Sequence, residues 1–202
     1  MVRGRPTVTL AQAVEVHRLA VAGHEADIAR DVGDRVAQVW LRTSRFADVV
    51  RLATATLTLG PAADAFYDRG WALSSTGQPR QAMTDYEQAL ILYRQAGHRG
   101  NEAATLTNIG GVYHGLGDRQ QALTYYQQAL PIRREVGDHA GEAVTRFNIA
   151  MIHRADGDLD RAVDELERVV DLDRQVGHPD LESDTAILEE VRQQRANASK
   201  ET

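Results

Sequence analysis

The sequence repeats itself every 40 residues, and this period limits what the chain can fold into. Segments 61–100, 101–140 and 141–180 superimpose without a gap. Small residues recur at equivalent positions of the three segments: Gly77, Gly117 and Gly157; Ala82, Ala122 and Ala162; Gly97, Gly137 and Gly177. An ungapped repeat of this length predicts a stack of similar units, each of which buries its apolar face against its neighbours.

Each repeat has the pattern of two helices joined by a turn. Apolar residues occur at helical spacing on both sides of the first glycine, and the last glycine ends the second stretch. The first glycine suits a turn with a positive φ angle, and the last one suits the left-handed end of a helix. The recurring alanine lies one turn into the second helix, where a small side chain lets the two helices approach closely. Each repeat is therefore expected to be an antiparallel helical hairpin.

An apolar stripe on the second helix requires the hairpins to stack. Tyr86 and Tyr126 follow the recurring alanine by four residues, and Ala89 and Ala129 lie three residues further on the same face. One hairpin alone cannot bury this stripe. The pattern thus predicts an all-α fold with ten helices, near residues 9–22, 25–42, 45–59, 62–76, 79–96, 101–116, 119–136, 141–156, 159–176 and 181–196.

Composition agrees with a helical globular protein. The 202 residues are 43% hydrophobic, 26% charged and 5% aromatic, and none is cysteine. Runs of β-branched and aromatic residues are few, which nearly excludes an all-β fold. No stretch approaches the roughly 18 uninterrupted apolar residues of a membrane span, and the N-terminus lacks the apolar run of a signal peptide. We therefore expect a cytoplasmic protein without disulfide bonds and without a membrane partner.

The best repeat resembles the tetratricopeptide repeat (TPR) family. The residues that carry the resemblance are Gly110, Tyr113, Gly117, Asp118, Ala122, Tyr126 and Ala129. The usual TPR period is 34 residues. The longer period here, with Asn108-Ile109-Gly110 and the segment 136–138, is similar to the branch found in kinesin light chains and bacterial signalling ATPases. The resemblance implies a right-handed superhelical α-solenoid of stacked antiparallel hairpins that acts as a protein–protein interaction scaffold.

The flanking segments carry weaker versions of the same pattern. Ser44 and Val49 reproduce the spacing of Gly117 and Ala122, which predicts a degenerate repeat with an awkward Gly33 in its first helix. The expected division is an N-terminal capping helix region over 1–26, a degenerate repeat over 27–60, repeats over 61–100, 101–140 and 141–180, and a C-terminal capping helix and tail over 181–202. The third repeat departs from the family pattern at Ala150, His153 and Leu166, so its packing should be less typical. In the last helix a charged residue, Glu189, occupies a stacking position, as expected of a solvating cap.

The first 42 residues also resemble the helix-turn-helix tail of recombinases. The matching residues are Gly4, Arg5, Pro6, Ile28, Ala29, Arg30 and Gly33. In that alternative Gly33 would be the turn before a recognition helix. That helix instead carries Trp40 and Leu41 where stacking needs them, whereas a DNA-reading helix needs basic and amide side chains. The formal charge of −6 also argues against nucleic acid, so a capping role is preferred.

No catalytic residue or cofactor is predicted. The sequence contains no phosphate-binding glycine loop, no zinc-protease motif and no nucleophile elbow. His98 and His178 share one repeat position after the helix-ending glycine, where a solvated loop or cap explains them better than a metal site. Asp156, Asp158 and Asp160 resemble part of a calcium loop, but turn and N-cap carboxylates are the simpler account.

A partner-binding surface is expected on the first helices, which line the concave groove of a stacked array. Carrying over the groove positions of the family gives Tyr67, Trp71 and Ser74; Thr107, Asn108, Gly111 and His114; and Phe147, Asn148, Met151 and Arg154. These side chains suit a peptide with apolar anchors and a hydrogen-bonding backbone. In the long-repeat proteins the repeated asparagine contacts the ligand backbone, but here Asn108 and Asn148 could equally bond a neighbouring helix. Arg154 alone does not make a carboxylate clamp.

Two classes of function stay open. The first is a non-catalytic module that binds a peptide or protein partner in its groove. The alternative is a regulatory or oligomerisation arm of a larger bacterial signalling or transcription protein, with an N-terminal helix-turn-helix contact to DNA as one version of it. Self-association is compatible with both.

Overall fold

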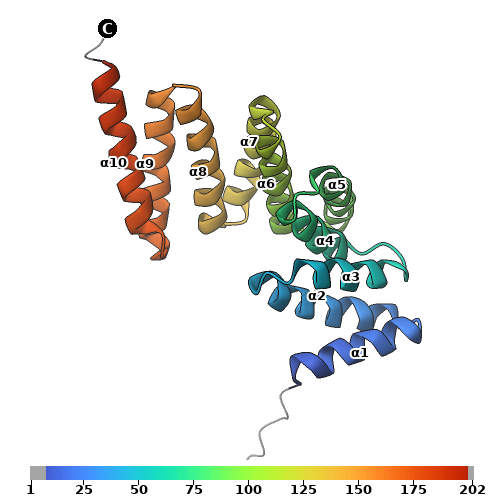
Figure 1. Cartoon of the computed structure of the whole chain (residues 1–202). Coiled ribbons are helices and arrows are strands. Elements are labelled where there is room, and N and C mark those ends of the chain that lie inside the picture. The colour runs from blue at the N-terminus through green and yellow to red at the C-terminus, as the bar shows by residue number, and fades with distance from the viewer. Residues whose placement is uncertain (1–7, 200–202) are drawn as a thin grey trace, which may run out of the picture. The chain divides into compact units, whose positions relative to one another are not determined.

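The computed structural model describes residues 8–199 and is all-α (Figure 1). Within that range it contains ten helices and no strand: α1 (Leu10–Ala22), α2 (Ala26–Arg42), α3 (Phe46–Leu57), α4 (Ala63–Ser75), α5 (Pro79–Ala96), α6 (Arg99–Gly115), α7 (Arg119–Glu135), α8 (His139–Ala155), α9 (Leu159–Val176) and α10 (Leu181–Ala198). Every helix begins and ends within two residues of the bounds expected from the sequence. The fold is a helical-repeat solenoid, as predicted.

The chain divides into two compact units, Met1–Ala96 and Gly97–Thr202. In the first unit α2 packs against α1, α3 and α4, and α4 packs against α5. In the second unit α6 pairs with α7, α8 with α9, and α9 with α10. Helices α6 and α8 begin at Arg99 and His139, which is two residues before residues 101 and 141, where the second and third repeats are expected to begin. The division into repeats stays a proposal.

The turns between the helices confirm the roles expected of the recurring glycines. Gly77, Gly117 and Gly157 have φ angles of 75°, 84° and 79°, and the helix-ending Gly97, Gly137 and Gly177 have φ angles of 70°, 69° and 65°. Ser44 has a φ of 56°, although it has a side chain. It therefore adopts the left-handed conformation at the position that glycine holds in the later hairpins.

Gly33 lies in the middle of the continuous helix α2, so the helix-turn-helix alternative is wrong at its central point. The residue is buried where α1 and α3 meet α2: a β-carbon at Gly33 would lie 3.1 Å from Thr56 Oγ1 and 3.2 Å from His17 Cδ2. His17 Nε2 and Thr56 Oγ1 are themselves hydrogen-bonded at 2.8 Å. Gly33 is thus required by close packing and not by a turn. Ile28, Ala29 and Arg30 of that motif lie in the same helix, and Gly4, Arg5 and Pro6 lie outside the described range.

The buried cores follow the predicted stripe. Ala82, Ala122 and Ala162 are each 0% exposed, and Tyr86 and Tyr126 are buried. In the third hairpin Leu166 takes the place of the tyrosine and packs with Ala150, Leu188 and Val191. Trp40 and Leu41 are buried in the core of the first unit, as the capping interpretation requires.

Surface charges at the C-terminal end also follow the expectation. The Glu189 side chain is 62% exposed and pairs with Arg192.

No helix among residues 8–199 combines the length and apolar character needed to span a lipid bilayer.

Candidate functional site

The first unit contributes an exposed tryptophan supported by an aromatic cluster. Trp71 on α4 is 42% exposed. Its ring meets the ring of Tyr67 edge-on at 6.4 Å, and Tyr67 in turn contacts the rings of Tyr86 and Tyr93 at 6.0 and 6.3 Å. Ser74, one turn further along α4, is partly exposed. Tyr67 therefore acts mainly as a packed support, and Trp71 is the side chain presented to solvent.

In the second unit, α6 presents three of its four predicted groove residues. Gly111 is exposed, and Asn108 and His114 are partly exposed. Thr107 differs from the prediction because it is only 7% exposed. Its hydroxyl lies 3.2 Å from that of Thr145 on α8 and donates to the Ala103 carbonyl at 3.0 Å. Thr107 thus joins α6 to α8 and is not available to a ligand.

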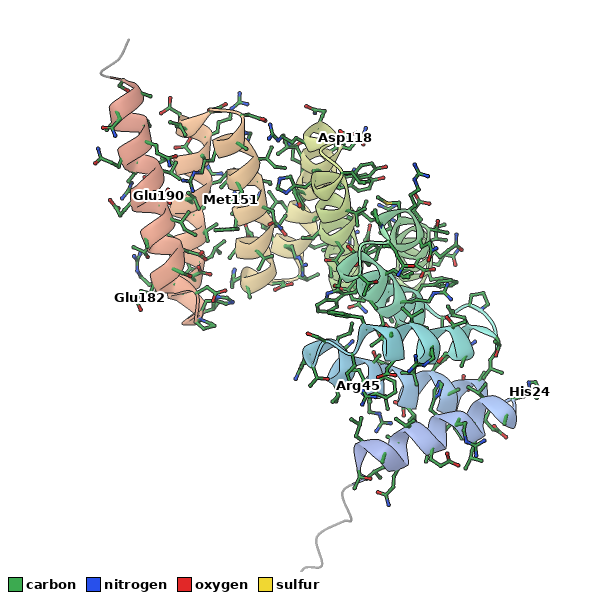
Figure 2. All side chains as sticks on the ribbon, viewed as in Figure 1. His24, Arg45, Asp118, Met151, Glu182 and Glu190 are labelled. Carbon is green, nitrogen blue, oxygen red and sulfur yellow. The ribbon has the colours of Figure 1, made fainter. Side chains whose placement is uncertain are left out.

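Helix α8 presents a mixed apolar and amide surface. Phe147, Asn148 and Met151 are all partly exposed, and Figure 2 labels Met151 on this helix. The side chains of Phe147 and Met151 pack at the edge of the core formed by α8, α9 and α10, and this packing fixes their positions. Val144, which is not among the predicted groove residues, lies one turn before Asn148 and is 50% exposed.

Arg154 on α8 is paired with side chains of the last helix. Its guanidinium donates to Glu190 Oε1 at 2.5 Å and to Gln194 Oε1 at 3.1 Å, both on α10. Figure 2 labels Glu190 on α10. Its charge therefore joins α8 to the last helix, and the place of Arg154 among the groove residues stays a prediction.

The repeated asparagine has different environments at its three positions. No hydrogen bond to the Asn148 side chain is present among residues 8–199, whereas Asn108 interacts within the protein. The first repeat has Asp68 instead, which is 1% exposed and accepts a hydrogen bond from Gln38 Nε2 at 3.2 Å. Burial, with the nearby charges of Asp34 and Asp64, raises the pKa of Asp68 to about 8. Asn148 is thus the asparagine with free hydrogen-bonding groups.

The second unit also contains a cavity that was not predicted from the sequence. It has a volume of about 170 Å³ and is lined by Ala143, Val144, Phe147, Asp173, His178, Asp180 and Asp184. Phe147 therefore belongs both to the predicted groove surface and to this acidic cavity. The sequence contains one sign of this cavity. Asp173 occupies the repeat position at which the preceding repeat has Arg133, so an acidic residue replaces a basic one there.

The carboxylates that resembled a calcium loop have structural partners. Asp158 caps α9 by accepting a hydrogen bond from the Arg161 amide, as predicted. Asp156 pairs with Arg119 at 2.7 Å, and Asp160 pairs with Arg195 at 3.3 Å. Within the part of the chain that the structure describes, no three histidine or carboxylate side chains are grouped so that they could hold a metal ion.

These features define an all-α repeat protein with exposed side chains on its first helices. The Tetratricopeptide repeat family matches residues 101–175 and, in a second match, residues 63–96. Together the two matches cover more than half of the sequence. The chain belongs to the tetratricopeptide repeat family, and its repeats support a protein–protein interaction scaffold. A comparison with curated proteins finds no match.

Several solved structures share the fold. The crystal structure of MamA has a TM-score of 0.66 and 15% identity, and the match covers 83% of this chain and 91% of that chain. BtubC from P. vanneervenii has a TM-score of 0.66 and 16% identity, with 93% and 91% covered. YrrB has a TM-score of 0.57 and 19% identity, with 89% and 84% covered. At these identities the likeness establishes the fold alone.

Proposed function

We propose that the second unit binds an extended peptide on the surface of α6 and α8. The observation that carries the proposal is the juxtaposition of Phe147, Asn148 and Met151, which offers two apolar side chains beside an amide without an internal partner. An extended peptide has backbone groups that such an amide can pair with, and side chains that the apolar residues can hold. In the first unit, Trp71 supplies a further exposed aromatic anchor of the kind that dominates many interfaces.

Similar proteins support this proposal at the level of the fold. YrrB is described as a TPR protein with an unusual peptide-binding site, and Cut9 was solved in a hetero-tetramer with Hcn1. The resemblance to the kinesin light chain branch stays a prediction. We further propose a non-catalytic role and a cytoplasmic location, both on the grounds given by the sequence.

The test is an affinity pull-down from the native host, followed by binding measurements on the partner that mass spectrometry identifies. Asn148→Ala and Trp71→Ala should weaken binding while circular dichroism stays unchanged. Gln127→Ala on α7, which changes an exposed side chain away from both first-helix surfaces, is the control. Full affinity in both variants would contradict the proposal.

A second candidate function is oligomerisation or docking on another domain. A groove of about 350 Å³ lies between α1 and α2. It is lined by apolar residues with one arginine: Val8, Leu10, Ala13, Val16, Val32, Arg35, Val36 and Val39. Three of these valines, Val8, Val16 and Val39, are 69%, 40% and 43% exposed. Exposed apolar surfaces of this kind commonly mark interaction sites.

This alternative is tested by the mass of the protein in solution. Light scattering coupled to size-exclusion chromatography should show a concentration-dependent increase above the monomer mass of 22.3 kDa. Val39→Glu should return the protein to the monomer mass, and Gln12→Glu on an exposed position of α1 should not. A monomer at all concentrations would reject self-association.

A further inference from the structure

The acidic cavity of the second unit has two chemically different walls. The first turns of α8 supply an apolar wall of Ala143, Val144 and Phe147. The end of α9, the following turn and the start of α10 supply Asp173, His178, Asp180 and Asp184. Its volume of about 170 Å³ is larger than one water molecule needs and suits the end of a long side chain.

Asp173 is the most constrained group in this cavity. Its side chain is 1% exposed, and its Oδ2 atom is buried without a hydrogen bond from a backbone amide or a basic side chain among residues 8–199. The carboxyl group of Asp184 is its hydrogen-bonding neighbour when Asp184 is protonated. The Oδ1 atom lies 3.9 Å from His178 Nδ1. That nitrogen accepts a hydrogen bond from the Asp180 amide at 3.3 Å, so it does not donate to Asp173. A buried carboxylate is costly unless it is paired, so this site is suited to receiving a donor.

The preceding repeat shows how the same position is neutralised elsewhere. Asp173 and His178 are equivalent to Arg133 and Asp138. In that earlier pair the Arg133 guanidinium forms an ion pair with the Asp138 carboxylate. In the last repeat an acid replaces the arginine, so the internal cation is missing at the corresponding place.

The other groups that face the cavity reinforce the negative charge. Asp180 and Asp184 are both carboxylic acids, α8 contributes no charged side chain, and His178 is the one basic group among the lining residues. Burial, together with a hydrogen bond and charge repulsion involving Asp173, raises the pKa of Asp184 to about 6. Above that pH Asp184 is ionised, which adds a negative charge beside Asp173.

The residues that line the cavity favour a guanidinium over a metal ion. Because no three acidic or histidine groups of the described chain are arranged to hold a metal ion, an organic cation is the better match. A planar guanidinium can donate to two carboxylates and lie against an aromatic ring, while its methylene stem contacts apolar side chains. Asp173, Asp184 and Phe147 provide these three elements.

We propose that the cavity formed by α8, α9 and α10 binds the side chain of an arginine in the partner peptide. The inference rests on the proposed peptide-binding function, since Phe147 lies on the proposed peptide surface and also lines the cavity. It adds a specificity: the peptide carries an arginine beside the segment that contacts Phe147 and Asn148.

The proposal can be tested before the natural partner is identified. The full chain is titrated at pH 7.5 with acetyl-Ala-Ala-Arg-Ala-Ala-amide, and backbone amide shifts are followed by NMR. Saturable shifts should appear at Val144, Asp173 and Asp184. The same peptide with citrulline, which is neutral and nearly isosteric, should bind at least about tenfold more weakly. Equal binding of the two peptides, or no saturable binding of the arginine peptide, would overturn the proposal.

Two carboxylates on α9 provide a matched pair of variants. Asp173→Asn removes the buried charge and should weaken the arginine peptide by at least about tenfold. Asp171→Asn makes the same chemical change two residues away at a side chain that is 68% exposed, and it should leave the affinity within about twofold. Equal effects of both variants would mean that only the general negative charge of the protein attracts the peptide.

A triple variant guards against a folding artefact. Asp173→Arg, His178→Asp and Leu181→Gly together introduce the residues found at Arg133, Asp138 and Gly141, where the ion pair packs directly against the glycine, so the protein should remain folded while the cavity no longer accepts arginine. Retained arginine-peptide affinity in this folded variant would overturn the proposal. If the natural partner is weakened by Asn148→Ala but not by Asp173→Asn, the arginine cavity is wrong and the proposed peptide surface still stands.

Discussion

Gly110 on α6 lies directly against the ring of Tyr126 on α7. A β-carbon built on Gly110 would be 2.6 Å from Tyr126 Cε1 and 2.7 Å from Cδ1. Tyr126 is 1% exposed, so its ring has little room to move away. The first hairpin repeats this arrangement with Gly70 and Tyr86, where the corresponding distance is 3.0 Å. The small residue and the tyrosine therefore set the spacing between the two helices of a hairpin.

Gly110→Ala is expected to destabilise the second unit. The added methyl group must displace a buried tyrosine, and such overpacking typically costs about 1 to 3 kcal/mol. The neighbouring Gly111→Ala is the control, because a β-carbon there would lie 3.8 Å from the Tyr126 hydroxyl, at ordinary contact distance. It should stabilise the helix by roughly 0.5 to 1 kcal/mol through lost backbone entropy in the unfolded chain. Chemical denaturation measures both, and equal signs would contradict the assigned packing.

Ser44→Gly should stabilise the first unit. Ser44 has a φ of 56°, and a residue with a side chain is strained in this region by about 1 kcal/mol. Glycine removes the strain but gains entropy in the unfolded state, so the expected net increase in the free energy of unfolding is about 0.5 kcal/mol. Thr43→Gly, at a φ of −106°, should instead reduce stability. A loss of stability in Ser44→Gly would show that its side chain makes an unrecognised contact.

The Arg69–Asp85 pair is expected to be important for the stability of the first unit. Both nitrogens of the Arg69 fork, Nε and Nη2, donate to the two carboxylate oxygens at 2.7 Å, and Asp85 is 4% exposed. Arg69→Ala leaves a buried carboxylate without its cation and should cost about 3 kcal/mol or more. Adding Asp85→Ala should recover part of that loss, as a double-mutant cycle would measure. The exposed pair Glu15–Arg18 provides the comparison, since breaking a solvent-screened pair should change the free energy of unfolding far less.

The periodic features could be predicted from the sequence because they depend on local geometry. A positive φ after a helix needs glycine, and a buried stripe needs apolar residues at fixed spacing, so the three repeats reveal helix bounds and core positions without tertiary information. Ser44 was found in the same way, from its spacing to Val49. The observed φ of Ser44 shows that it adopts the left-handed conformation that glycine adopts at the equivalent positions.

Side-chain partners on neighbouring helices could not be predicted in this way. Gly33 looked like a turn residue because its packing partners, His17 and Thr56, are far away in the sequence. Arg154 looked available because its partners are on the last helix, which follows the repeat pattern only weakly. The 40-residue period therefore predicts the helices and the core, whereas the partners of the surface side chains can be identified only from the structure.

Asp68→Asn should make the stability of the first unit less sensitive to pH. Burial and the charges of Asp34 and Asp64 raise the pKa of Asp68 from 3.8 to about 8 in the folded protein. The folded state therefore holds this proton more tightly, so the stabilisation is present below pH 4 and is lost as the pH rises through 8.

Asparagine, the residue at the equivalent positions 108 and 148, keeps the acceptor for Gln38 without a charge. At pH 9 the variant should be more stable than the parent in urea denaturation, by up to about 5 kcal/mol for a shift of this size, and near pH 4 the difference should shrink. Asp27→Asn, at a fully exposed side chain, should show no such trend. A constant difference between Asp68→Asn and the parent from pH 4 to 9 would mean that Asp68 does not titrate in this range.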